Sequence, residues 1–481
     1  MNRRVVFYHV GRLLQIEAAL LLLPLLVSVI YREKSFYSFI ITAAVTWLVG
    51  FLFTKLCRKK DSTTLYVREG FAIVALAWVM MSLAGALPFF ISGEIPSYVD
   101  SFFETVSGFT TTGASILPNV EALSKGMLFW RSFTHWVGGM GVLVFVMAIF
   151  PQESGRSIHI MRAEMPGPIV GKLVPKIKDT AKILYLIYIV ITFIQIIFLV
   201  AGRMPLFDSV IHSFGTAGTG GFGIKADSIA GYSPYLQWVI TIFMLIFGIN
   251  FNLFYLLIIR RFKSVLKSTE LWCYIAIVVV STAAISINIY SSYSGIAETV
   301  RTAAFQVSSI ITTTGYATTD FNLWPGFSKM ILVTLMFIGG CAGSTAGGFK
   351  LSRVIILFKS TFRDLRQTMR PRSVSSVKLE GKTLDKQTIE GVRGYLAIYT
   401  IIFFILAALL SIENLDFETT MTSVVATFNN VGPGLGGVGP ASSFASFSDP
   451  AKILLSIAML LGRLEIYPLL LAFSPALWRK K

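Results

Sequence analysis

A glycine turn placed between apolar segments occurs four times along this chain. Each time, a short segment ends in a Thr- or Asn-rich turn that closes on glycine, and apolar segments long enough to span a bilayer lie on both sides. The pivotal glycines lie about 107, 95 and 117 residues apart, which is a long internal repeat. They are Gly113, Gly220, Gly315 and Gly432. Four copies of span, half-span, glycine turn and span in one chain predict a pseudo-fourfold pore.

The composition of the chain indicates a membrane protein. Its 481 residues are 54% hydrophobic and 14% charged, with a mean hydropathy of +0.70, whereas about 25% of residues are charged in soluble proteins. Many apolar runs approach the roughly 20 residues that cross about 30 Å of hydrocarbon. No small-residue cleavage site follows the first run, at 13–30, so we expect a retained span rather than a signal peptide. The three scattered cysteines indicate neither a disulfide framework nor a metal cluster.

The net charge of +17 is distributed unevenly along the chain. Lys and Arg gather in alternate loops, at 55–60, 156–182, 260–267, 350–393 and 479–481. This asymmetry is the positive-inside pattern, and it predicts that both termini are cytoplasmic. The basic residues therefore indicate membrane topology and no nucleic-acid partner.

We expect an all-α polytopic membrane protein, in which two transmembrane helices precede four repeats around a central pore. Each repeat contains a helix, a short pore helix, a filter loop and a second helix. The two extra helices are expected within 1–60, and the repeats at 70–155, 176–262, 270–370 and 388–481. The second helices of the repeats are expected at 127–150, 234–259, 327–340 and 451–478.

The short helices are the most informative element of each repeat. They are expected near 99–110, 206–217, 296–311 and 416–429. Twelve residues rise only about 18 Å, so such a helix enters the membrane without crossing it. An acidic residue suits the positive end of each helix, and the acids at these ends are Asp100, Asp208, Glu298 and Asp416. The negative C-terminal ends would then point toward the middle of the bilayer.

Four glycine turns at that depth would form a cavity lined by backbone carbonyls. Irregular backbone is tolerated there only where it lines water or is buried in protein. Glycine allows consecutive carbonyls to face one axis, and a neighbouring Thr adds a hydroxyl oxygen, as in potassium-channel filters. Glycines used only for close helix packing are the alternative. Four turns at matched positions favour a cation site.

Several motifs resemble those of one family of membrane proteins. They are Ser-Gly-Phe-Thr-Thr-Thr-Gly-Ala (107–114), Arg-Ala-Glu-Met-Pro-Gly-Pro (162–168), Gly-Gly-Cys-Ala-Gly-Ser-Thr-Ala-Gly-Gly (339–348), Asn-Asn-Val-Gly-Pro-Gly-Leu-Gly (429–436) and Gly-Arg-Leu-Glu-Ile (462–466). Together they resemble the bacterial Trk/Ktr/HKT potassium transporter superfamily over essentially the whole chain. The two spans ahead of the first repeat resemble the TrkH/TrkG type specifically.

The resemblance implies that the glycine turns form a filter that binds the transported K⁺. The ion-lining residues implied by position are Thr111, Thr112, Gly113, Thr219, Gly220, Thr313, Thr314, Gly315, Asn430, Val431 and Gly432. No repeat contains a full Thr-Val-Gly-Tyr-Gly sequence, so we expect a shorter and less strictly selective filter than that of a potassium channel. No organic cofactor is expected in this chain.

The resemblance also implies two protein partners. One is a second copy of the chain, in a homodimer. The other is a TrkA-type cytoplasmic regulatory subunit with nucleotide-binding (RCK) domains. The basic segment 350–393 and the loop 162–168 are the expected docking surfaces, and the remaining partner is membrane lipid.

The second helix of the third repeat breaks at 338–350. Five glycines within ten residues disfavour a helix by about 1 kcal/mol each relative to Ala. A cytoplasmic linker and a flexible intramembrane loop beneath the filter both fit this composition. The resemblance favours the loop, at 339–349, acting as a gate. Its glycines are Gly339, Gly340, Gly343, Gly347 and Gly348.

Three further ionisable residues lie within the predicted spans. Arg463 is expected in mid-span, where a charge costs about 2.5–3.5 kcal/mol and usually faces a cavity, so we expect it to gate the path by repelling K⁺. The alternative is a structural ion pair with Glu465, although residues two apart point to different helix faces. Glu17 is expected to meet interfacial water or a basic neighbour. His135 is expected to be structural or interfacial rather than a metal ligand.

These observations predict potassium uptake across the bacterial inner membrane, through a channel-like filter gated by the loop and by a cytoplasmic subunit. A proton- or sodium-coupled potassium symporter is the alternative, and the small number of carboxylates and histidines in the spans weighs against it. The sequence has no His-Glu-x-x-His, paired Asp or Gly-x-Ser-x-Gly motif that would indicate an enzyme.

Overall fold

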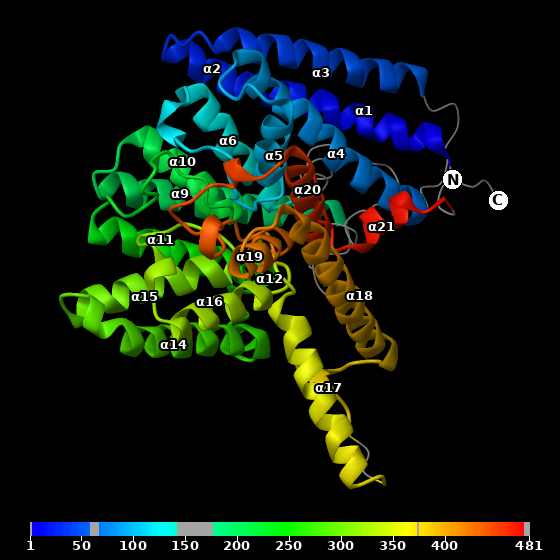
Figure 1. The fold of residues 1–481 in the computed structure, drawn as a ribbon. Helices are drawn as coiled ribbons and strands as arrows, with labels where there is room; N and C mark the ends of the chain where they lie inside the picture. The colour runs from blue at the N-terminus through cyan, green and yellow to red at the C-terminus, as the bar shows by residue number, and fades with distance from the viewer. Residues whose placement is uncertain (1, 58–66, 142–176, 373–374, 476–481) are drawn as a thin grey trace.

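The computed structural model describes residues 2–57, 67–141, 177–372 and 375–475 (Figure 1). Its first helices are α1 (Arg3–Leu20), α2 (Leu22–Ile30) and α3 (Phe36–Leu56). Four units of three helices follow: α4 (Val67–Ser92), α5 (Tyr98–Phe109) and α6 (Lys125–Gly139); α9 (Ile177–Ala201), α10 (Leu206–Gly218) and α11 (Pro234–Phe247); α14 (Thr269–Ile289), α15 (Ile296–Ile311) and α16 (Gly326–Ile338); α18 (Lys386–Leu410), α19 (Phe417–Phe428) and α20 (Asp449–Arg463). The other elements are α12 (Phe251–Ile258), α13 (Phe262–Leu266), α17 (Leu351–Met369), β1 (Lys378–Leu379), β2 (Lys382–Thr383) and α21 (Tyr467–Phe473).

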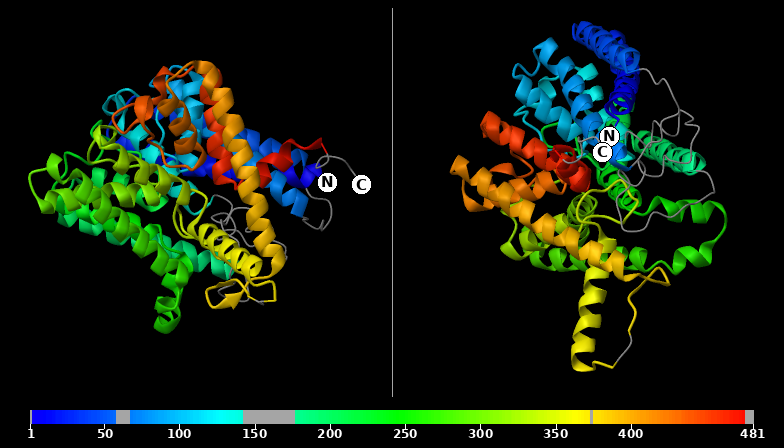
Figure 2. Two further views of the ribbon diagram at one scale, coloured as in Figure 1. Left: turned by 60° about the horizontal axis from the view of Figure 1, so that its bottom comes forward. Right: turned by 90° about the vertical axis from the view of Figure 1, so that its right-hand side faces the viewer.

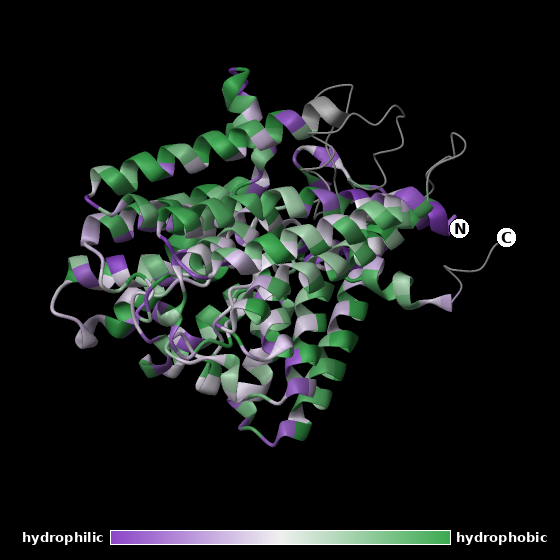
Figure 3. Cartoon of the chain, turned by 90° about the horizontal axis from the view of Figure 1, so that it is seen from above, coloured by the Kyte–Doolittle hydropathy of each residue, from purple (hydrophilic) through white to green (hydrophobic). Residues whose placement is uncertain are grey.

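Long apolar helices give the chain the means to cross a bilayer. Within the described ranges, six helices are long and apolar enough to span a membrane, or up to seven if the bent pair α11–α12 is counted as one span. Figure 3 shows hydrophobic residues along these helices, and many of them are exposed, such as Ile287 and Ile401. Exposed apolar surface of this extent marks a face that contacts lipid. The chain is an integral membrane protein.

The four short helices, α5, α10, α15 and α19, lie within about two residues of their predicted ranges. They contain 12, 13, 16 and 12 residues. Asp416 is the N-cap of α19, and its carboxylate accepts a hydrogen bond from the Thr419 amide at 2.9 Å. The other expected acids, Asp100, Asp208 and Glu298, lie in the first turns of their helices. The acids therefore stabilise the helix N-termini, as the sequence predicts.

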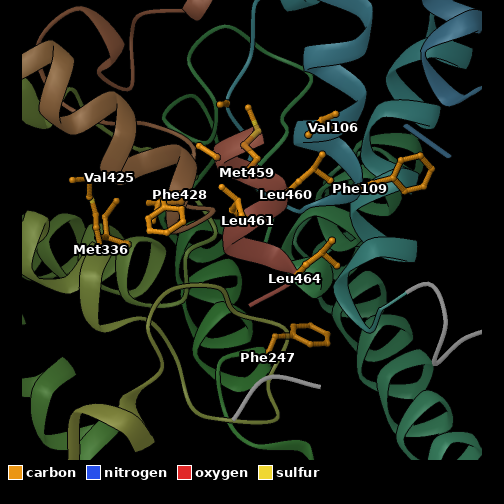
Figure 4. Packing of buried hydrophobic residues seen from close by; sticks show 14 of the residues in the cluster. Val106, Phe109, Phe247, Met336, Val425, Phe428, Met459, Leu460, Leu461 and Leu464 are labelled. Carbon is orange, nitrogen blue, oxygen red and sulfur yellow. The ribbon is translucent and has the colours of Figure 1, made fainter. Parts of the chain in front are cut away.

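Contacts between consecutive units close the four units into a ring. The helix after each turn packs against the short helix of the next unit: α6 on α10, α11 on α15, α16 on α19, and α20 on α5. Figure 4 shows the last of these contacts, where Leu460 of α20 points toward Phe109 of α5 and Leu461 lies nearer to Phe428 of α19. Because this contact returns to the first unit, the cycle is closed.

The helices that follow the second and fourth turns are broken. Between α11 and α12 the chain bends by 91°. Between α20 and α21, Glu465 and Ile466 have φ angles of 54° and 65°, which no helix accommodates. The predictions of uninterrupted spans at 234–259 and 451–478 are therefore wrong. α16 ends at Ile338, as expected, and the part of the 127–150 span beyond residue 141 lies outside the described residues.

The remaining helices surround this ring. α1 packs on α3 and α4, α2 on α6, and α21 on α4. α1 begins ten residues before the predicted span at 13–30, and the Asn2 amide donates to the Glu69 carboxylate in the first turn of α4 at 3.0 Å. α17 projects away from the rest of the molecule in Figure 1 and in the right-hand view of Figure 2.

Candidate ion pathway

The four glycine turns share one backbone conformation. Each begins with a Thr or Asn in the left-handed region, with φ of 55°, 55°, 54° and 55° at Thr111, Thr219, Thr313 and Asn430. Two residues later each has a glycine of positive φ, with values of 83°, 77°, 84° and 100° at Gly113, Gly221, Gly315 and Gly432. A side chain is disfavoured in this region. The shared geometry accounts for the repeated sequence pattern.

The second turn corrects the predicted register by one residue. Its glycine of positive φ is Gly221, and Gly220 occupies the position that Thr112, Thr314 and Val431 hold in the other turns. Gly220 is needed for a different reason. A Cβ atom built on it would lie 2.3 Å from Cγ of His135, which is far too close. The assignment of Gly220 as the pivotal glycine is therefore wrong, although Gly220 does lie within the turn.

The four turns meet around one axis. A Cβ atom built on each turn glycine would collide with the carbonyl oxygen of the middle residue in the next turn. The distances from the built Cβ to the carbonyl oxygen are 2.1 Å from Gly113 to Gly220, 2.0 Å from Gly221 to Thr314, 2.3 Å from Gly315 to Val431, and 2.7 Å from Gly432 to Thr112. These contacts run from the first turn to the fourth and back to the first. The turns consequently form a closed ring in which backbone lies directly against backbone.

The first residues of the turns add side-chain oxygens to the ring. Thr111, Thr219, Thr313 and Asn430 are all fully buried. The Asn430 amide donates to Thr112 Oγ1 and to the Met459 carbonyl, both at 2.9 Å. Thr111 Oγ1 and Asn430 Oδ1 have no hydrogen-bond partner among the described residues. A buried oxygen left unpaired costs about 1–3 kcal/mol, so these two atoms are suited to hold a cation or water.

A buried ion pair contacts the segments that follow the first two turns. Arg131 Nε lies 2.5 Å from Glu104 Oε1, and both side chains are almost completely buried. Glu104 also accepts hydrogen bonds from Ser115 Oγ and from the Ile116 amide, each at 3.0 Å. Arg131 donates to the carbonyl of Gly223 in the second unit at 2.9 Å. The pair thus connects one short helix to the segments that follow two neighbouring turns, and no motif singles it out.

His135 has the structural role that was expected, but at a different place. It is fully buried beside the second turn rather than at the membrane interface. Its Nδ1 lies 2.7 Å from the Gly108 carbonyl, and its Nε2 accepts a hydrogen bond from the Phe222 amide at 3.3 Å. A ring that donates from one nitrogen and accepts at the other is neutral. No group of three or more His, Cys, Asp or Glu side chains that could hold a metal ion occurs within the described ranges.

The glycine-rich loop 339–349 lies directly against the turns. The Gly347 amide donates to Thr313 Oγ1 at 2.6 Å, and the Thr345 hydroxyl donates to the Phe247 carbonyl at 3.2 Å. The bend between α11 and α12 holds the loop from the other side, through Cys341 N to Gly248 O at 3.1 Å and Phe251 N to Gly343 O at 3.0 Å. Most of the loop is buried. The interpretation as an exposed cytoplasmic linker is therefore wrong.

Arg463 joins this loop to the first unit. It lies in the last turn of α20 rather than in mid-span. Its guanidinium donates to the Thr345 carbonyl at 3.0 Å, and to the carbonyls of Gly138 and Gly139 at 2.5 and 2.7 Å. Glu465, the expected alternative partner, forms an ion pair with Arg353 of α17. Arg463 therefore holds three carbonyls together below the ring of turns.

The comparisons with known proteins agree with this architecture. The family model for TrkH, described as a cation transport protein, matches residues 34–480. The chain belongs to the TrkH family. It is 38% identical to the Trk system potassium uptake protein TrkH of Salmonella typhimurium and 35% identical to TrkG of Escherichia coli, with 99–100% of each chain covered. The crystal structure of the potassium transporter TrkH from Vibrio parahaemolyticus matches the whole chain at 34% identity, with a TM-score of 0.89.

A small cavity in this TrkH-family chain is lined by the loop, by the ends of α6 and α20, and by Asn430 of the fourth turn. Its volume is about 40 Å³, enough for a few water molecules. Gly347, Asn430, Arg463 and Lys350 are among the residues that line it. Lys350 is almost fully buried, and its ammonium donates to the Ala346 carbonyl. The sequence predicts that Lys350 begins a basic cytoplasmic segment and gives no sign that this side chain is buried.

Glu17 also departs from its expected environment. It is fully buried, and neither carboxylate oxygen has a hydrogen-bond partner within the described part of the TrkH-family chain. Its Oε1 lies 3.1 Å from a Cβ atom built on Gly85 of α4. The expectation of interfacial water or a basic neighbour is wrong because α1 and α2 together form one candidate span, Arg3–Ile30, and Glu17 lies near its middle.

Proposed function

We propose that this TrkH-family chain takes up potassium ions across the bacterial inner membrane, through a filter formed by the four turns. The observation that carries the proposal is the closed cycle in which each turn glycine lies against a carbonyl of the next turn. Rings of oxygen atoms can replace the water shell of K⁺. The relatives in Salmonella typhimurium and Escherichia coli are named potassium uptake proteins, which supports the same ion.

The ion ligands in this proposal are oxygen atoms at two levels. The middle residues, Thr112, Gly220, Thr314 and Val431, supply backbone carbonyls. The first residues supply side-chain oxygens, and Thr111 Oγ1 and Asn430 Oδ1 are the two that have no hydrogen-bond partner among the described residues. The glycines Gly113, Gly221, Gly315 and Gly432 permit the carbonyls of neighbouring turns to approach each other. K⁺ is the transported ion, and no organic cofactor takes part.

Below the filter, the loop 339–349 acts as the gate. It is buried beneath the third turn, bonded to Thr313 through Gly347, and held by Arg463 through Thr345. Arg463 and Lys350 place two basic side chains at the cavity under the filter. Like charges this close to the path would repel K⁺. Opening therefore requires the loop and these side chains to move together.

The chain works with partners, as the Trk system named in its relatives suggests. We place a TrkA-type nucleotide-binding subunit on the cytoplasmic segment 350–393 and a second copy of the chain in a homodimer. The second expected docking loop, 162–168, lies outside the described residues. Both termini face the cytoplasm in this arrangement, and the repeats occupy 70–155, 176–262, 270–370 and 388–481.

Ion flux into proteoliposomes tests the filter. We expect purified protein to conduct K⁺ and Rb⁺ in preference to Na⁺ and Li⁺. Gly315→Ser should reduce this preference, because its Cβ would lie 2.3 Å from the Val431 carbonyl. Gly93→Ser is the matched control, since Gly93 also has positive φ but a Cβ there meets no atom of the described residues within 4 Å. Unchanged selectivity in Gly315→Ser would refute the filter.

The reversal potential distinguishes passive conduction from a coupled symporter. With passive conduction, the reversal potential of the current follows the potassium gradient alone. A shift of the reversal potential with an imposed proton or sodium gradient would show coupling.

A further inference from the structure

A short hairpin next to α17 lies at the start of a chain of hydrogen bonds that ends at the gating loop. Strands β1 and β2 are joined by Glu380 and Gly381, whose φ angles of 51° and 73° are those of a tight two-residue hairpin turn. Leu379 is buried, and Lys359 of α17 donates to the Lys378 carbonyl at 2.9 Å. The hairpin is therefore fixed in place, although the Glu380 side chain is exposed.

Glu380 caps the helix that opens the third unit. Its Oε1 accepts hydrogen bonds from Ser268 Oγ at 3.1 Å and from the Glu270 amide at 3.0 Å. Ser268 is the N-cap of α14, and Glu270 lies in its first turn. A carboxylate at a helix N-terminus satisfies amides that have no partner within the helix. The hairpin thereby sets the position of the first turn of α14.

Glu270 carries the connection into the gating loop. Its side chain is buried, and its Oε1 accepts a hydrogen bond from the Ala342 amide at 2.8 Å. Ala342 lies in the glycine-rich loop, next to Cys341, whose amide is bonded to the bend after α11. The loop has no regular secondary structure to hold its shape, so each such hydrogen bond limits where it can lie.

We propose that Glu380 and Glu270 are positioning residues that hold the gating loop closed, and that displacement of the hairpin opens it. The proposal rests on the proposed gate and adds the part of the chain whose displacement opens it, the hairpin. The hairpin lies within the cytoplasmic segment 350–393, so a protein bound there could pull Glu380 away from Ser268 and Glu270. Loss of the cap would shift the first turn of α14 and release the Ala342 amide.

Cys341 provides a direct measure of loop position, because it lies in the loop and is only 1% exposed. With Cys57→Ser and Cys273→Ser as background, Cys341 is the single thiol of the full-length chain. The rate of its alkylation by a small water-soluble maleimide is measured in proteoliposomes, together with K⁺ flux. We expect Glu380→Ala to raise both rates at least threefold. Glu380→Gln keeps an oxygen acceptor and should stay closer to the parent.

Glu390→Ala is the matched control, because Glu390 is an exposed acid of the same segment that pairs with Lys386. It should leave both rates unchanged. Glu270→Ala and the double variant of Glu270→Ala with Glu380→Ala complete a double-mutant cycle. If the two acids act in series, the alkylation rate and the K⁺ flux of the double variant should be only slightly higher than those of the stronger single variant. Fully additive effects, or parental Cys341 reactivity in correctly inserted Glu380→Ala, would overturn the proposal.

A separate variant shows whether a negative result concerns this connection or the gate itself. Arg463→Gln weakens a different contact of the loop, the hydrogen bond to the Thr345 carbonyl. If Arg463→Gln raises flux and Glu380→Ala does not, the gate stands and the role of Glu380 is refuted. If neither raises flux, the proposed gate fails as well.

Discussion

At the scale of single residues, the two adjacent glycines of the second turn serve different purposes. Gly221 has a φ of 77°, which disfavours any side chain there. Gly220 has no such requirement and instead leaves room for the His135 ring. A sequence that reads Gly-Gly at this point gives no means of separating the two roles. The distinction needs the position of a histidine about 85 residues earlier in the chain.

This difference predicts that a second substitution, His135→Ala, affects the variants of the two glycines differently. Gly220→Ala and Gly221→Ala should both reduce K⁺ flux. Adding His135→Ala should restore part of the flux to Gly220→Ala, because it removes the ring that the new methyl group meets. It should restore none to Gly221→Ala, where the backbone strain of about 1–2 kcal/mol remains. Flux measurements on the four variants test this, and equal restoration in both would contradict the assigned register.

Arg463 predicts a gain of function. A guanidinium about 6 Å from K⁺, at an effective dielectric of about 20, repels the ion by roughly 3 kcal/mol. Arg463→Gln also weakens the bonds to Thr345, Gly138 and Gly139. We expect it to raise K⁺ flux about tenfold or more, whereas Arg463→Lys, which keeps the charge, should stay nearer to the parent. Arg370→Gln, on an exposed arginine after α17, is the control. Slower flux in correctly inserted Arg463→Gln would show that the side chain has a purely structural role.

At the scale of elements, the sequence predicted the short helices well and the broken helices poorly. The short helices have acids at one end and a glycine turn at the other, so both ends are marked. The breaks at 248–250 and 464–466 are only three residues long and leave the hydropathy of the run almost unchanged. Burial of Lys350 was also beyond prediction, because it depends on tertiary packing rather than on local sequence. The Glu104–Arg131 pair was missed for the same reason, since its members lie on two different helices.

The gating loop yields a prediction at this scale. Deleting residues 342–347 removes the partners of Glu270, Arg463 and Thr313 in one step. We expect basal K⁺ flux without any cytoplasmic subunit to rise above that of the parent, with selectivity retained. Flux assays in proteoliposomes, with the unaltered chain inserted in the same way, give the comparison. A deletion that inserts but conducts no faster would count against a plug.

At the scale of the whole molecule, the central feature is a closed ring of four units, formed once by contacts between helices and again by contacts between turns. The helices close it through α6 on α10, α11 on α15, α16 on α19 and α20 on α5. The turns close it again through glycine and carbonyl contacts between neighbours. The sequence repeat predicted four similar units and one axis, but not the order of contacts that joins them. Since every turn supports the next, a change in one turn should disturb the whole site.

The most direct test of the account is the location of a heavy potassium substitute in crystals of the full-length protein. Rb⁺ is detected by its anomalous scattering and replaces K⁺ without changing the chemistry of the ligands. The account predicts a peak on the axis between the carbonyls of Thr112, Gly220, Thr314 and Val431, and its loss when Gly315→Ser is crystallised in the same way. No peak at this position in Rb⁺-saturated crystals of the unaltered protein would contradict it.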